Sequence, residues 1–145
     1  MNTQTSSSKV VFDIETNGLK PTKIWCIVAK VIGGEIHKFP PHKIKEGIEF
    51  LQDADILIGH NIIGYDIPVI KKLCGVELTN KVEDTLVMSR LFNPAQENGH
   101  SLKTWGYKIG IPKMESPDSF EEYTPEMLKY CAQDTKLNEY VYDRL

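Results

Sequence analysis

The chain has 145 residues, 41% of them hydrophobic and 26% charged, a composition typical of one soluble globular domain and not of a disordered segment. The net charge of −3 argues against a long basic face for nucleic acid, but it allows a small site whose carboxylates are neutralised by metal ions. No apolar stretch approaches the roughly 18 residues that span a bilayer, and no signal-like apolar segment follows the polar first eight residues. We expect a cytoplasmic protein, with no membrane partner, that has a disordered tail at residues 1–8 and one domain over residues 9–145.

The first element is an apolar run, Val10–Phe12, which predicts a buried strand that continues into Asp13 and Glu15. Because side chains of a strand alternate between faces, Asp13 and Glu15 emerge together on the face opposite Phe12, roughly 6 to 7 Å apart. Two such charges repel each other and resist desolvation unless a cation or a proton relieves the conflict. Residues 16–18 are good turn formers, so a strand that ends in a solvated turn is the alternative.

The following segments alternate between strand and helix patterns. Strands are expected over residues 24–32, 35–39 and 55–59, and helices over residues 43–53, 66–73, 101–110 and 124–145. From Val82 the pattern changes from strand to helix, and the apolar anchors expected for this helix are Leu86, Val87, Leu91 and Phe92. A hairpin followed by alternating helices and strands predicts an α/β domain with a mixed central sheet flanked by helices.

Three cysteines, Cys26, Cys74 and Cys131, are widely spaced and odd in number. This pattern favours reduced thiols packed as small hydrophobic side chains over a disulfide framework or a zinc site. Reduced thiols agree with an intracellular location.

The last expected helix carries an aspartate, Asp134, in the middle of its apolar stripe. A buried carboxylate is costly without a partner, and no Lys or Arg shares this stripe within a turn on either side. Tyr130 lies one helical turn before Asp134 and therefore beside it. The alternative is an aspartate at the edge of the core that pairs with a basic residue from elsewhere in the chain.

A further acidic residue, Asp66, lies where a strand end joins the start of a helix, between Gly64 and the apolar residues of that helix. Most aspartates at such a position cap the helix N-terminus, so capping is the alternative here. Asp84 at the next strand-to-helix junction has an even stronger claim to being a cap.

Asp13, Glu15 and Asp66 all lie at or just past strand ends, where an α/β sheet gathers its functional groups, and the last helix adds Asp134. Two charges about 5 Å apart repel by roughly 3 kcal/mol at an effective dielectric of about 20, so such a cluster opposes folding unless divalent cations lie within it. Oxygen ligands favour Mg²⁺ or Mn²⁺ over zinc. Pairs of metal ions held by carboxylates catalyse in-line displacement at phosphorus. The expected cluster therefore indicates hydrolysis of a phosphodiester.

These residues resemble a known family. Residues 13–15, 61–66 and 130–134 match, in order, the three exonuclease motifs of the DEDD superfamily. Lys129 stands where the histidine branch has its histidine, and Tyr130 favours the tyrosine branch. Residues 84–91 and 100–107 further resemble the 3′→5′ proofreading domains of phage family A DNA polymerases. The resemblance covers about residues 9–145 and implies a ribonuclease H-like fold.

By this resemblance Asp13, Glu15, Asp66 and Asp134 are the ligands of two divalent metal ions, Mg²⁺ or Mn²⁺. Asp13 is expected to contact both ions. Glu15 and Asp134 are expected to hold the ion that acts on the attacking water, and Asp66 to act on the second ion. Tyr130, the fifth catalytic residue, is expected to orient that water together with Glu15. The implied reaction releases nucleoside 5′-monophosphates from the 3′ end of DNA.

The resemblance also implies substrate-binding residues. Leu19 matches the apolar wedge between the last two bases, and Thr16 is expected to hold the 3′-terminal nucleotide. Asn61 and Tyr65 are expected to support the strand near the scissile phosphate. The implied partners are single-stranded DNA or a frayed primer 3′ end, and a DNA polymerase module, fused or separate. No polymerase segment follows Leu145, so a phage-encoded protein of this kind is expected to be an excised domain, a free-standing exonuclease or one piece of a split polymerase.

Two alternatives to a DNA exonuclease stay open. One is an RNA 3′ exonuclease of the ribonuclease D type, with the same fold and chemistry. The other is a catalytically silent nucleic-acid-binding domain, against which the complete set of carboxylates and Tyr130 argues. Five lysines are candidate phosphate contacts, with a solvated surface position as the more ordinary expectation for them: Lys71, Lys72, Lys103, Lys108 and Lys113.

Overall fold

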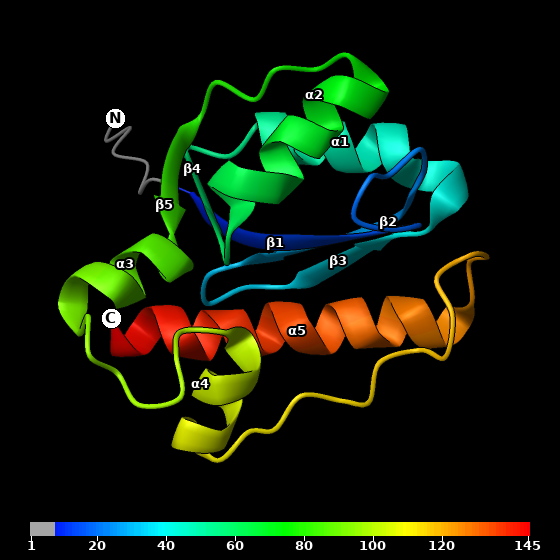
Figure 1. Ribbon diagram of the computed structural model, residues 1–145. Coiled ribbons are helices and arrows are strands. Elements are labelled where there is room, and N and C mark those ends of the chain that lie inside the picture. The colour runs from blue at the N-terminus through cyan, green and yellow to red at the C-terminus, as the bar shows by residue number, and fades with distance from the viewer. Residues whose placement is uncertain (1–7) are drawn as a thin grey trace, which may run out of the picture.

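The computed structural model describes residues 8–145, and its centre is strand β1 in a mixed sheet of order β3-β2-β1-β4-β5 (Figure 1). The strands are β1 (Lys9–Thr16), β2 (Ile24–Val31), β3 (Ile36–Phe39), β4 (Ile56–Gly59) and β5 (Lys81–Asp84). The antiparallel strands β2 and β3 lie on one side of β1, and the parallel strands β4 and β5 lie on the other. The fold class expected from the sequence, a mixed sheet flanked by helices, is confirmed.

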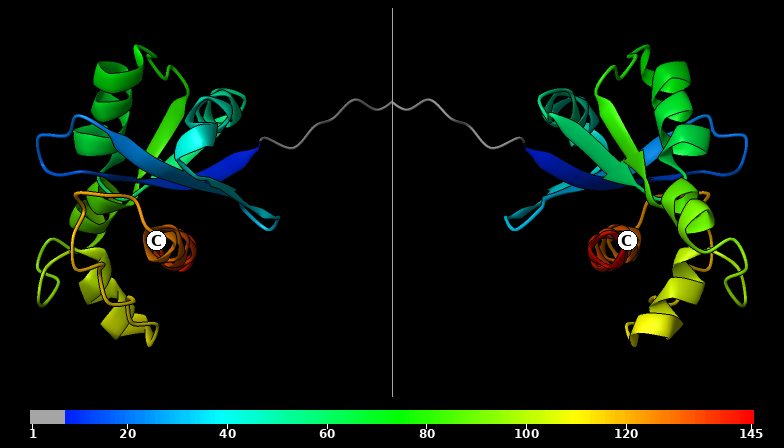
Figure 2. Two further views of the ribbon diagram at one scale, coloured as in Figure 1. Left: turned by 90° about the vertical axis from the view of Figure 1, so that its right-hand side faces the viewer. Right: turned by 90° about the vertical axis from the view of Figure 1, so that its left-hand side faces the viewer.

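Helices cover both faces of the sheet (Figures 1 and 2). They are η1 (Pro41–Lys43), α1 (Ile44–Gln52), the π-helical turn η2 (Ile62–Asp66), α2 (Ile67–Cys74), α3 (Thr85–Phe92), α4 (Leu102–Ile109) and α5 (Pro125–Arg144). Phe12 and Ile14 of β1 belong to the core that α1 and α2 cover. On the opposite face, Cys26 and Val28 of β2 pack against Cys131 of α5. The alternation predicted for the first strand is therefore present, and its acidic face is the one that α5 covers.

The ends of the helices follow local sequence signals. Ser101 caps α4 by accepting a hydrogen bond from the backbone N–H of Thr104, and Thr124 caps α5 in the same way through Met127. Gly75 and Gly110 end α2 and α4 with φ values of 68° and 81°, in the left-handed region that glycine adopts without strain.

Helix α3 differs from the expectation. Val87, Leu91 and Phe92 were expected as apolar anchors, but their side chains are exposed, Leu91 to 78% and Phe92 to 74%. The buried side chains of α3 are instead Thr85 and Ser89. Both donate or accept hydrogen bonds within a buried polar network, so polar contacts and not an apolar stripe hold this helix.

The N-terminal tail expected over residues 1–8 falls almost wholly outside the described residues. Ser8 is described, and its backbone N–H donates to Asp55 Oδ2 at 2.7 Å. Cys26, Cys74 and Cys131 are free thiols, as expected, but Cys74 is exposed and does not pack in the core. Within residues 8–145, no helix combines the length and the apolar character that a membrane crossing requires.

Candidate functional site

Three carboxylates from the two ends of the chain meet where β1 crosses α5. Oxygen atoms of Asp13, Glu15 and Asp134 all lie within 4.8 Å of one another. Asp13 and Glu15 share the face of β1 that α5 covers, and Asp134 is buried on the face of α5 that packs against the sheet. The structure thus brings the sequence-predicted Asp134 to the acidic pair at the end of the first strand.

Asp66 lies beside this cluster and not within it. It is buried, and its Oδ2 accepts a hydrogen bond from the backbone N–H of Ile14 at 3.2 Å. Its side chain makes no capping hydrogen bond to α2, so the capping alternative for Asp66 is wrong. Asp84, in contrast, does cap α3 through the N–H of Leu86, and it also accepts from the N–H groups of Asn61 and Ile63. Asp84 therefore holds in place the turn that carries Asp66.

Burial, together with the crowding of acidic groups, raises the pKa values of these carboxylates. Loss of solvation, followed by repulsion from Asp134, raises the pKa of Asp13 to about 7. Loss of solvation, with added repulsion from Asp13 and Asp134, raises the pKa of Glu15 to about 10. Burial also raises the pKa values of Asp66 and Asp134, with Asp13 contributing at Asp66 and Lys113 opposing the shift at Asp134. The raised pKa values show that neighbouring groups of the protein only partly offset the negative charges of these carboxylates.

Lys113, which the sequence offered only as a candidate phosphate contact, is the basic residue from elsewhere in the chain that pairs with Asp134. Its Nζ lies 3.2 Å from Asp134 Oδ2 and 5.1 Å from the centroid of the Tyr130 ring. The side chain is only 22% exposed, so a solvated surface position, the ordinary expectation, is wrong for this lysine. Burial by itself lowers its pKa, but attraction to Asp134 and interaction with Tyr130 raise it to about 12. No local signal in the loop before α5 indicates this contact, because only the packing of that loop creates it.

The expected substrate-binding residues flank the cluster. Thr16 Oγ1 and the Tyr65 hydroxyl are 2.6 Å apart, and both also reach the carbonyl oxygen of Gly18. These contacts attach the turn after β1 to η2. Leu19, at the tip of that turn, is 94% exposed. Asn61 has a left-handed backbone (φ 63°) and lines the same cleft as the carboxylates.

A buried hydrogen-bond network under the cleft also escaped the sequence analysis. His60 Nδ1 is 2.8 Å from Thr85 Oγ1, and His60 Nε2 is 2.7 Å from the carbonyl oxygen of His100. Asn138 of α5 donates to Thr85 Oγ1 at 2.9 Å. Burial lowers the pKa of His60, which keeps this ring neutral and able to accept as well as donate. The network ties α3, α4 and α5 around one cleft.

That cleft has a volume of about 630 Å³ and mixed chemistry. The carboxylates and Tyr130 line one part of it, and Arg90, His100 and Ser101 line another. An acidic centre beside the guanidinium group of Arg90 suits a phosphodiester, whose reacting phosphorus needs metal ions while its remaining phosphates attract cations.

The donor set fits divalent metal ions. Asp134 Oδ1 is buried and has no hydrogen-bond partner among residues 8–145, although Oδ2 of the same carboxylate is paired with Lys113. A buried oxygen without a partner is costly, and an ion at this position would satisfy it. Because the three carboxylates offer only oxygen ligands, the cluster fits hard divalent cations, the class that includes Mg²⁺ and Mn²⁺.

No protein-family model matches the chain. The DNA-directed DNA polymerase of Enterobacteria phage T3 is 26% identical in an alignment that covers 87% of this chain and 24% of the polymerase. The corresponding polymerase of Escherichia phage T7 is 28% identical, over 62% of this chain and 19% of the polymerase. The chain thus spans about a quarter or less of the length of these curated relatives.

Solved structures of nucleases share the fold. NrnC of Brucella melitensis bound to pGG superposes with a TM-score of 0.74 at 17% identity, covering 94% of this chain and 71% of NrnC. The same protein with bound Mg²⁺ gives a TM-score of 0.70 at 20% identity, covering 96% and 74%. The family B DNA polymerase of Pyrobaculum calidifontis gives 0.70 at 16% identity, covering the whole of this chain and 25% of the polymerase. The structure has the ribonuclease H-like fold of DEDD-type nucleases and of polymerase exonuclease domains.

Proposed function

We propose that this chain, a relative of phage family A DNA polymerases with the fold of DEDD-type nucleases, is a metal-dependent 3′→5′ exonuclease of the proofreading type. The observation that carries the proposal is the cluster of Asp13, Glu15 and Asp134, in which one buried oxygen of Asp134 has no hydrogen-bond partner in the described part of the chain, residues 8–145. A cluster of this kind opposes folding unless cations or protons relieve the repulsion, and hydrolysis of a phosphodiester is the chemistry that two such cations serve.

In this proposal Asp13, Glu15, Asp66 and Asp134 hold two divalent ions, Mg²⁺ or Mn²⁺. When bound, the ions activate the attacking water and stabilise the charge that develops on the leaving 3′-oxygen. The structure of the neighbour NrnC with bound Mg²⁺ supports this choice of metal. Asp66, outside the cluster of three, suits a role on the second ion.

The chain's own residues position the reactants. Tyr130 and Glu15 orient the water whose oxygen forms a bond to phosphorus as the bond from phosphorus to the 3′-oxygen of the preceding nucleotide breaks. The products are a nucleoside 5′-monophosphate and a strand with a new 3′-hydroxyl. Thr16 and Tyr65 hold the terminal nucleotide, with Asn61 supporting the strand and the exposed Leu19 separating the last two bases. Selection of frayed ends follows, because unstacking an unpaired base costs less.

Single-stranded DNA or a frayed primer 3′ end is the proposed substrate, and a DNA polymerase module is the proposed partner. The relation to phage polymerases favours DNA and an intracellular phage protein. RNA is the second candidate substrate, because the structural neighbours include NrnC bound to pGG and the catalytic core of RRP6 from Trypanosoma brucei.

Degradation of 5′-labelled single-stranded DNA and of the matching RNA, each with Mn²⁺, Mg²⁺ or excess EDTA, tests the proposal. We expect a ladder that shortens from the 3′ end of the DNA and no digestion in EDTA. Digestion that continues in EDTA would exclude the mechanism, and a ladder for RNA alone would transfer the proposal to a ribonuclease. If neither strand shortens with either metal, the proposed activity is wrong.

A further inference from the structure

A second hollow adjoins the cleft that holds the carboxylates, at Lys113 and Tyr130. These two residues line both spaces. The second hollow has a volume of about 300 Å³, and its other walls come from Lys103 and Tyr107 of α4 and from residues 114–116 of the following loop. The two spaces are therefore neighbours, which places the surface of α4 next to the cleft that holds the carboxylates.

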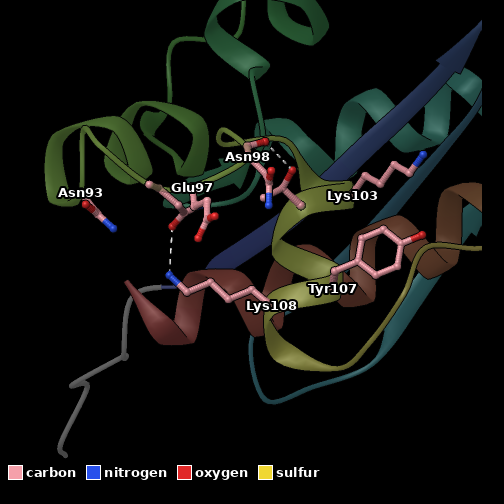
Figure 3. A pocket seen from close by; sticks show the side chains of 8 residues that line it. Asn93, Glu97, Asn98, Lys103, Tyr107 and Lys108 are labelled. Atoms are coloured by element: carbon pink, nitrogen blue, oxygen red, sulfur yellow. Dashed lines mark hydrogen bonds between the residues drawn. The ribbon is translucent and has the colours of Figure 1, made fainter.

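The wall that α4 contributes combines a cation with an aromatic ring. Lys103 and Tyr107 are four residues apart and lie on one face of the helix, and the Tyr107 side chain is 70% exposed. Figure 3 shows Lys103 and Tyr107 on the side of α4 away from Lys108. Lys108 points the other way, where its Nζ donates to Gln96 Oε1 at 3.0 Å and lies over the ring of Trp105. Tyr107 is thus a large aromatic side chain left exposed at the second hollow.

Close backbone contacts and a buried hydrogen bond fix helix α4, which forms one wall of the hollow, against the following loop and α3. Ile111 donates its backbone N–H to the carbonyl oxygen of Gly106 at 2.8 Å. A Cβ atom at Gly106 would lie 2.6 Å from the carbonyl oxygen of Ile111, so this close approach requires glycine. Trp105 is buried and donates to Ser89 Oγ, which attaches α4 to α3. The position of Tyr107 relative to Lys113 is therefore determined by packing.

We propose that this hollow binds the substrate strand on the 5′ side of the scissile phosphate, with Tyr107 stacking on a base and Lys103 contacting a phosphate. The inference rests on the proposed function, which places the 3′-terminal nucleotide at the carboxylates. A cationic groove with an exposed aromatic ring is typical of proteins that bind single-stranded nucleic acid. Each base of the strand offers a face for stacking on the ring, and each nucleotide offers a phosphate for the cations. Glu115 also lines the hollow and opposes the phosphate, so it weakens binding.

The arrangement predicts a dependence on substrate length. A dinucleotide reaches the carboxylates but not α4, whereas a decanucleotide occupies both. Tyr107→Ala should lower kcat/KM for the decanucleotide by about 5- to 140-fold, the range for loss of one stacked base, and leave kcat/KM for the dinucleotide unchanged. Tyr107→Phe should restore the parental value, because its ring still stacks. Lys45→Ala, which removes an exposed lysine of α1 on the opposite side of the sheet, is the charge-matched control for Lys103→Ala and should change the rate for neither substrate.

Direct binding provides a test that does not depend on turnover. We would measure the fluorescence anisotropy of labelled decathymidylate and decauridylate in EDTA, as a function of salt. Lys103→Ala should weaken binding and reduce the slope of log K against log salt by about 0.7, the value for one phosphate contact to a single strand, and Glu115→Gln should strengthen binding.

Failure of the proposed exonuclease activity and failure of the proposed strand path, the binding of the strand in the hollow at Lys103 and Tyr107, give different results. Absent hydrolysis of both lengths, together with Tyr107-dependent binding, would overturn the exonuclease and leave the strand path intact. Normal hydrolysis with equal effects of Tyr107→Ala on both lengths, or with no effect on decanucleotide binding, would overturn the strand path and leave the exonuclease intact.

Discussion

Lys113 extends into the cleft and places its Nζ 3.2 Å from Asp134 Oδ2, while Oδ1 of the same carboxylate is buried without a partner among residues 8–145. One lysine thus neutralises part of a cluster of three carboxylates. The remaining negative charge is what divalent ions are expected to neutralise.

Replacing Lys113 should destabilise the metal-free protein. In Lys113→Met the carboxylate cluster loses its cation, and we expect the free energy of unfolding in EDTA to fall by about 1 to 3 kcal/mol. The rise in melting temperature on adding Mn²⁺ should become larger than in the parent. Lys30→Met is the matched control, because Lys30 forms a similarly shielded ion pair with Glu139, 2.8 Å long and away from the cluster. An equal Mn²⁺ response in both variants would contradict a special role for Lys113.

Asp134→Asn should separate stability from activity. The amide keeps the shape of the side chain but removes one charge from the cluster, so stability in EDTA should stay level or rise. Turnover of single-stranded DNA should fall by roughly 10³-fold, because a ligand worth several kcal/mol in the transition state is lost. Asp143→Asn, at an exposed position near the end of α5, should retain parental turnover. Parental rates in Asp134→Asn would show that the site is misassigned.

The metal-free protein should lose stability as the pH rises. The pKa of Asp13 is about 7 in the folded protein and close to 3.8 in the unfolded chain, so the folded state binds more protons between these values. Deprotonation then favours unfolding, and the stability is greatest near pH 4 and falls toward pH 7. Thermal melting in EDTA across this window, compared between the parent and Asp13→Asn, measures the effect. A parent that gains stability relative to the variant over this range would reverse the assigned sign.

Tyr130→Phe should cost less than the loss of Asp134. The phenyl ring can keep its position under Lys113, at the distance of 5.1 Å that Tyr130 has, so only the hydroxyl group is removed. We expect kcat to fall roughly 10- to 100-fold, with the Mn²⁺-induced rise in melting temperature unchanged. Steady-state kinetics and melting on the same preparation check both statements. A loss as large as that of Asp134→Asn, or a weaker response to Mn²⁺, would assign Tyr130 to metal binding.

Much of the fold follows from short-range patterns. The alternation around Phe12 predicted which face of the first strand carries Asp13 and Glu15, and the stripe of the last helix predicted the burial of Asp134. Caps at Ser101 and Thr124 likewise follow from neighbouring residues. These features depend on backbone periodicity and on contacts within one helical turn, which a sequence displays directly.

Other features depend on contacts between segments far apart in the chain. The apolar residues Leu91 and Phe92 were expected in the core, but α3 is held through Thr85 and Ser89, whose partners lie on other elements. Lys113 reaches Asp134 only because the loop before α5 folds back over the cleft. The local sequence pattern determined which side chains each strand and helix presents on each face. Tertiary packing decided which charged groups meet. The sequence alone does not give this second result, because the energy of a charge depends on its distance from other charges and from water.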